Sequence, residues 1–101
     1  MRVILNQDIL LAEDIRLIKR LYKVPVDQDF PIGLKFTYQY LLFKNNEWIE
    51  VCRIDNYNHE KKKIGTHVHK RRNRRVEFKN MNFEEAEKYI ISLGERLSRE
   101  L

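Results

Sequence analysis

Hydrophobic and polar residues alternate most clearly between residues 34 and 43. One face carries apolar side chains: Leu34, Phe36, Tyr38, Tyr40 and Leu42. The other face carries Lys35, Thr37 and Gln39. A period of two residues is typical of a strand that buries one face, and aromatic residues favour this conformation. The segment therefore predicts a strand with its apolar face toward the core.

A second strand is expected after a turn at residues 44–47. The sequence of this turn is Lys-Asn-Asn-Glu, and asparagine accepts the left-handed backbone angles of tight turns. Residues 48–55 would then return as the partner strand. Strict alternation would place Ile49, Val51, Arg53 and Asp55 on one face, and Trp48, Glu50, Cys52 and Ile54 on the other.

Residues 9–22 fit two different patterns. Four apolar residues recur at the spacing of one helix face: Leu11, Ile15, Ile18 and Tyr22. The same segment also fits a strand that starts after a turn at residues 12–14, with Leu17 and Leu21 on one face. Intrinsic propensity favours the helix, so both interpretations stay open at this point.

The last third of the chain predicts two short strands and a helix. Residues 64–70 and 76–78 fit the strands, with a turn at Asn73, and Asn82 with Glu85 fits a helix-capping box. The helix that follows has an apolar stripe: Phe83, Ala86, Ile90, Leu93 and Leu97. Residues 1–101 therefore predict a single small α+β domain. It would have an antiparallel sheet of about five to six strands and a C-terminal helix packed on one face.

Length and composition fit one soluble domain. The chain has 101 residues, 43% of them hydrophobic, and no apolar run exceeds four residues, so we expect no transmembrane segment. The first residues do not resemble a signal peptide. The single cysteine, Cys52, cannot form an internal disulfide. A cytoplasmic location is therefore expected.

Positive charge is concentrated in one stretch. Between Lys61 and Arg75 there are eight Lys or Arg and no Asp or Glu, and without those eight charges the net charge of +5 would become −3. A local basic stretch predicts a polyanion partner, most often nucleic acid. The candidate nucleic-acid-binding residues are Lys61, Lys62, Lys63, Lys70, Arg71, Arg72, Arg74 and Arg75. The alternative is a solvated basic loop that binds nothing.

Two histidines lie inside this basic stretch. A strand would place His67 and His69 on the same face, about 6.5–7 Å apart, and imidazole suits general acid–base catalysis near neutral pH. Beside basic residues the natural substrate is a phosphodiester, and in RNA the 2′-hydroxyl can be the nucleophile without a metal. Asp55 could hold one imidazole tautomer and Tyr57 could share the proton transfers. We therefore expect these four residues to form a catalytic group that uses no cofactor, although the sequence leaves open whether the protein is an enzyme.

Metal binding is an alternative role for the same residues. His59, His67, His69 and Asp55 together could bind zinc, nickel or iron. The surrounding positive charge opposes a dication, and His-x-His alone is a weak signal. In a further interpretation the histidines only pair with backbone or carboxylate groups, and the protein is a non-enzymatic nucleic-acid-binding or protein-interaction module.

Several short motifs occur in a fixed order along the chain. They are Val24-Pro25, Pro31-Ile32-Gly33-Leu34-Lys35-Phe36, Asp55-Asn56 and Gly65-Thr66-His67-Val68-His69, followed by the strand and helix predicted for residues 76–97. In this order of features the sequence resembles the TumE family of small toxins from bacterial and archaeal toxin–antitoxin pairs. The family often carries an acidic residue soon after the second histidine, where this chain has Lys70-Arg71-Arg72.

The resemblance implies a growth-inhibiting toxin of a type II system, encoded beside an antitoxin with a helix-turn-helix DNA-binding domain. It also favours strands over helix for residues 15–24. It does not define the target, so RNA cleavage is an inference from the histidine and arginine chemistry alone. The expected partners are therefore RNA and the antitoxin, whose acidic segment would suit residues 61–75. A homodimer is compatible with the sequence, and no membrane partner is expected.

Overall fold

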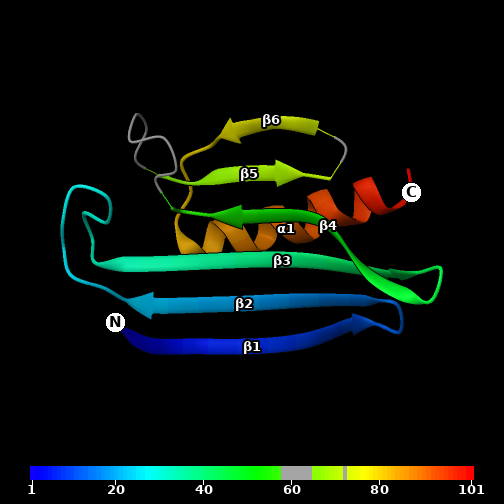
Figure 1. Ribbon diagram of the computed structural model, residues 1–101, viewed down its shortest axis with the longest axis horizontal. Helices are drawn as coiled ribbons and strands as arrows, with labels where there is room; N and C mark the ends of the chain where they lie inside the picture. The colour runs from blue at the N-terminus through cyan, green and yellow to red at the C-terminus, as the bar shows by residue number, and fades with distance from the viewer. Residues whose placement is uncertain (58–64, 72) are drawn as a thin grey trace.

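The computed structural model describes residues 1–57, 65–71 and 73–101 (Figure 1). Their strands are β1 (Arg2–Ala12), β2 (Ile15–Lys23), β3 (Leu34–Lys44), β4 (Glu47–Asp55), β5 (His67–Lys70) and β6 (Asn73–Phe78), and the helix is α1 (Phe83–Ser98). In this part of the chain the strands form one six-stranded antiparallel sheet in sequence order. α1 packs across one face of β3 and β4. The predicted α+β fold, with a C-terminal helix on one face of an antiparallel sheet, is confirmed.

Residues 9–22 belong to a β-hairpin, so the helical alternative is wrong. β1 and β2 meet at a turn formed by Glu13 and Asp14. β2 pairs with β3 along its whole length, and Leu17 lies opposite Tyr40 in that pairing. Leu17 is thereby 1% exposed. Tertiary pairing with β3 therefore overrides the local preference for helix.

The core lies between the sheet and α1. β3 supplies Phe36, Tyr38, Tyr40 and Leu42, and each of them is at most 8% exposed. The Tyr38 hydroxyl donates a hydrogen bond of 2.8 Å to the carbonyl of Phe83, at the start of α1. Near the end of α1, Gly94 lies directly over the ring of Tyr40, where a Cβ would overlap the ring. These contacts fix both ends of α1 on β3.

A β-bulge in β4 changes which side chains share a face. Tyr40 pairs with Cys52 but Leu41 pairs with Glu50, so Val51 is the extra residue. Val51 and Cys52 are both buried, each 1% exposed. The strict alternation expected for residues 48–55 is therefore wrong before the bulge. Glu50 lies on the same side of the sheet as Arg53, which it contacts.

The turns and the helix start follow the sequence signals. Asn45 and Asn46 both have positive φ angles, 53° and 64°, in the tight turn between β3 and β4. Asn82 and Glu85 form the predicted capping box at the start of α1. Asn73, predicted as a turn, instead begins β6 and pairs with Lys70. Among the described residues, no helix has the length and apolarity needed to cross a membrane.

Candidate functional site on the front face of the sheet

The pairing of β4 with β5 brings four polar residues together. Arg53 lies opposite His69 and Asp55 lies opposite His67. Directly opposite residues in an antiparallel pair point to the same side of the sheet. Ile54 and Val68, which alternate with them, are buried in the core beneath α1. The four polar side chains therefore point away from α1, toward the side that we call the front face, which is nearer the viewer in Figure 1.

Asp55 is the centre of this group. Its side chain is 2% exposed, and its Oδ2 lies 3.3 Å from Nε2 of His69 and 3.4 Å from Nε of Arg53. The backbone N–H of Tyr57 donates a hydrogen bond of 3.3 Å to Oδ1 of Asp55. A buried carboxylate held in this way fixes the orientation of the facing imidazole. Asp55 is thus placed to orient the ring of His69.

His67 is another member of this group. Its ring meets the ring of Phe78 edge to face, with centroids 5.8 Å apart. Phe78 approaches because position 65 is a glycine: its φ of +134° is unfavourable for other residues, and a Cβ there would lie 2.9 Å from the Phe78 ring. Gly65 therefore helps to place the aromatic side chain that packs against His67. The histidine pair and Asp55 share one face, as the sequence predicted.

Tyr57 is joined to the same face through β3. The Thr37 hydroxyl donates a hydrogen bond of 3.0 Å to the Tyr57 hydroxyl, and Thr37 lies opposite Asp55 in the sheet. The ammonium of Lys35 lies 4.2 Å from the centroid of the Tyr57 ring. The phenol is therefore held by contacts to two residues of β3, Lys35 and Thr37.

Arg53 is the residue that the sequence analysis missed. Its guanidinium contacts Asp55 and also lies 3.7 Å from a carboxylate oxygen of Glu50. Glu50 in turn accepts a hydrogen bond of 2.9 Å from Gln39. Arg53 is 36% exposed at its side chain, so it can still meet a ligand. Its position two residues before Asp55 on one strand was the signal that could have identified it.

The predicted nucleic-acid-binding residues do not all lie on this face. Lys70 alternates with His69 and forms a 2.9 Å ion pair with Glu77, and it lies opposite Cys52, which belongs to the core side. Arg71 and Arg75 are exposed at the turn after β5 and on β6. The remaining candidates, Lys61, Lys62, Lys63, Arg72 and the side chain of Arg74, lie outside the described residues.

The metal alternative depends on a residue that the structure does not describe. His59 lies in the segment 58–64. Within residues 1–57, 65–71 and 73–101, no group of three His, Cys, Asp or Glu side chains is arranged to hold a metal ion. In that part of the chain, the Asp55 carboxylate lies between His69 and Arg53.

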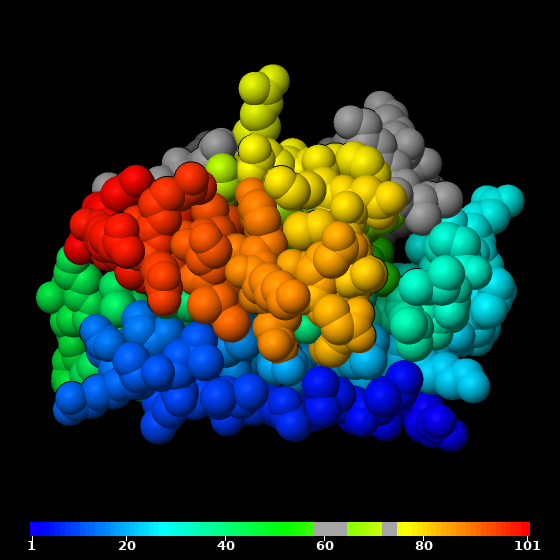
Figure 2. Space-filling model, turned by 180° about the vertical axis from the view of Figure 1, so that it is seen from behind, coloured from blue at the N-terminus to red at the C-terminus, as the bar shows by residue number. Residues whose placement is uncertain are grey.

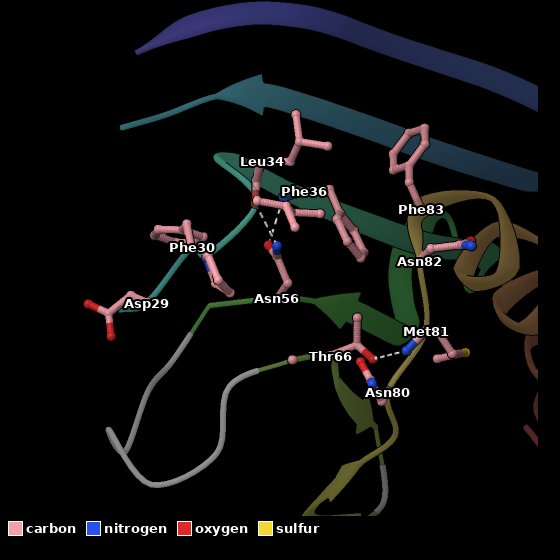
Figure 3. Close-up of a pocket in the computed structure, with 13 residues that line it drawn as sticks. Asp29, Phe30, Leu34, Phe36, Asn56, Thr66, Asn80, Met81, Asn82 and Phe83 are labelled. Atoms are coloured by element: carbon pink, nitrogen blue, oxygen red, sulfur yellow. Dashed lines mark hydrogen bonds between the residues drawn. The ribbon is translucent and has the colours of Figure 1, made fainter. Parts of the chain in front are cut away.

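A pocket of about 300 Å³ lies at the end of the sheet beside this group. Figure 3 shows Asn56 at its wall, where the side-chain amide accepts a hydrogen bond from the Phe36 N–H at 2.8 Å and donates one to the Leu34 carbonyl at 2.7 Å. Thr66 accepts a 3.0 Å hydrogen bond from the Met81 N–H on another wall. Asn56 and Thr66 directly adjoin Asp55 and His67 in sequence. These hydrogen bonds therefore hold in place the end of β4 and the start of β5, where Asp55 and His67 lie.

Comparisons of the sequence with protein-family models and curated proteins, and of the structure with solved structures, gave no match.

Proposed function

We propose that this protein is the toxin of a type II toxin–antitoxin pair and that it cleaves RNA by acid–base chemistry at His67 and His69. The observation that carries the proposal is the shared face of β4 and β5, where both imidazoles lie with Asp55 and Arg53. The resemblance to TumE-like toxins supports the physiological role, and the chemistry of the side chains supports the reaction.

The cleavage step uses the two imidazoles on either side of one phosphodiester. One neutral imidazole takes the proton of the ribose 2′-hydroxyl, and the 2′-oxygen forms a bond to phosphorus. The bond from phosphorus to the 5′-oxygen breaks, and this oxygen receives a proton from the other, protonated imidazole. The products are a 2′,3′-cyclic phosphate and a 5′-hydroxyl. An i, i+2 separation of about 6.5–7 Å leaves room for a phosphate between the rings.

The neighbouring residues have supporting roles in this proposal. Asp55 favours the protonated form of His69, so His69 is the proton donor and His67 is the base. Arg53, which lies opposite His69, supplies a positive charge and would bind the phosphate as its negative charge grows. Tyr57 would position the ribose or share a proton through its hydroxyl, which Thr37 holds in place.

The test is cleavage of a defined RNA oligonucleotide by the purified protein, with and without a chelator. We expect cleavage that survives chelation and yields a 2′,3′-cyclic phosphate end. His67→Ala and His69→Ala should each abolish cleavage and growth arrest, while Lys44→Ala, at the end of β3 beside the β3–β4 turn, should not. A matched RNA with 2′-deoxyribose at the cleaved position should resist. Toxicity that survives both histidine substitutions in a folded protein would refute the proposal.

A non-enzymatic binding module is the second candidate, because Arg71 and Arg75 are exposed beyond the histidine pair. In that case charge reversal at these arginines would abolish RNA binding, and the affinity would fall steeply with salt. The histidine substitutions would then leave growth arrest unchanged. Measuring both sets of variants on the same RNA separates the two functions.

A further inference from the structure

The outer edge of β1 forms one rim of the sheet. Within residues 1–57, 65–71 and 73–101, no strand pairs with this edge. Four apolar side chains of β1 are well exposed: Val3 58%, Ile4 47%, Leu10 66% and Leu11 41%. Figure 2 shows β1 in dark blue along the lower rim, clear of α1, which packs on β3 and β4. A long apolar strand therefore ends the sheet with free backbone hydrogen-bonding groups along its edge.

Monomeric proteins usually protect such an edge with lysine, proline, β-bulges or inward-pointing charges. β1 has no proline, and its charged residues are Arg2 at one end and Asp8 near the middle. The Asp8 carboxylate is already paired with Arg16 of the neighbouring strand. This pairing holds the pKa of Asp8 below its ordinary value, so the charge is compensated at neutral pH. The pairing of β1 with β2 is irregular between Val3 and Leu5 and between Leu10 and Ala12, so the regular stretch that can accept another strand runs from Leu5 to Leu10.

The order of residues along β1 is symmetric about Gln7. Residues 3–5 are apolar, residues 6–8 are polar and residues 9–11 are apolar. When this strand runs antiparallel to a second copy, with Gln7 facing Gln7, each apolar block meets the other apolar block. Asn6 then faces Asp8, and Leu5 faces Ile9. The regular pairing of Leu5 to Leu10 with β2 keeps these facing side chains on matching sides of the sheet.

We propose that the occupant of this edge is a second copy of the chain, which pairs β1 with β1 in antiparallel register about Gln7. The twofold axis is then perpendicular to the sheet, and the two sheets become one. Such an axis leaves both front faces on the same side. The two groups of His67, His69, Asp55 and Arg53 would then share one continuous surface. The proposal stands on the edge strand alone and does not depend on RNA cleavage.

The first test is the mass of the full-length protein in solution, by sedimentation or light scattering over a range of concentrations. We expect a dimer, with twice the mass of one chain. Leu10→Lys should weaken the dimer by at least about tenfold in Kd, because it places a charge in the apolar contact. Ser92→Lys adds the same charge on the exposed side of α1 and should leave the dimer unchanged.

Disulfide cross-linking then tests the register. Gln7→Cys should form a covalent dimer on mild oxidation, because residue 7 faces itself across the axis. Leu10→Cys should not, because its copies would lie six residues apart along the strand, about 20 Å. The native Cys52 is 1% exposed and does not compete. Folding of each variant is checked by circular dichroism.

Three results would overturn the proposal. The first is a wild-type protein that remains monomeric at every concentration. The second is a dimer that Leu10→Lys leaves intact. The third is cross-linking through residue 10 but not through residue 7, because the strands would then pair in another register. A dimer that cross-links through residue 7 and is lost in Leu10→Lys supports it.

Discussion

The imidazole of His69 lies 3.3 Å from the buried carboxylate of Asp55, across the pairing of β4 with β5. The carboxylate also has the Arg53 guanidinium at 3.4 Å, so it lies between a cation and an imidazole. A carboxylate at 2% exposure is favourable only with such partners. In the proposed reaction Asp55 is therefore a positioning residue that acts through His69.

Asp55→Asn tests this role. The substitution keeps the shape of the side chain but removes its charge, so protonated His69 loses its stabilising partner. We expect RNA cleavage to fall by about 10- to 100-fold, and the limb of the pH–rate profile that depends on protonated His69 to move to lower pH. The pH–rate profile is the decisive measurement, because a purely structural defect would lower the rate at every pH without shifting the profile. Thermal unfolding of the variant supplies the control.

Gly94→Ala should destabilise the protein, although alanine is the better helix former by about 1 kcal/mol. The new Cβ would overlap the ring of Tyr40, which is itself 2% exposed and cannot swing away. We expect a loss of about 1–3 kcal/mol in the free energy of unfolding, as for other overpacked cores. Ser92→Ala, on the exposed side of the same helix, should be neutral or slightly stabilising. Urea titration measures both.

Asn56→Asp should destabilise the end of the sheet. The carboxylate can still accept the hydrogen bond from the Phe36 N–H, but it cannot donate to the Leu34 carbonyl, which then faces a negative oxygen. We expect a loss of about 1–3 kcal/mol in the free energy of unfolding at neutral pH. Protonation of the new carboxyl restores a donor, so part of the loss should be recovered near pH 3. Equal loss at both values of pH would contradict this account of the side chain.

Glu77→Gln should lower the free energy of unfolding at neutral pH, and less so at low pH. The hydrogen bond from Lys70 holds the pKa of Glu77 below its ordinary value of 4.5. The stabilisation is therefore complete above pH 4.5 and is lost as the pH falls through the lowered pKa. At pH 7 the variant should be less stable than the wild type by about 0.2–1 kcal/mol, because the pair is exposed. Chemical denaturation at pH 7 and pH 3 should show the difference shrinking at the lower value.

The sequence predicts most of the fold because its strongest signals are local. The period of two over residues 34–43 and the capping box at Asn82 are both found as expected. The hairpin of β1 and β2 was ambiguous because Leu11, Ile15, Ile18 and Tyr22 fit one helix face, while Leu17 and Leu21 fit one strand face. The choice depends on pairing with β3, which a propensity scale does not contain.

The candidate site was only partly predictable for a similar reason. His67, His69 and Asp55 were found because their spacing places them on one face. The bulge at Val51 changes the phase of β4, and no residue type signals it, so Glu50 was placed on the wrong side. Lys70 was grouped with the arginines by sequence, yet strand alternation puts it on the other side of the sheet, beside Glu77. Charge counts along a chain carry no information on which face a strand presents.

The strand order also has a consequence for biosynthesis. Each strand pairs with the one that precedes it in the chain, so the sheet can grow by successive hairpins, which close short loops and form quickly. Asp55 emerges from the ribosome with β4, but its imidazole partner arrives only with β5. The helix that covers the core, with Gly94 over Tyr40, follows β6 in the chain. A nascent chain thus carries the Asp55 carboxylate before the imidazole that lies beside it in the folded protein, and their contact forms only once β5 has joined the sheet.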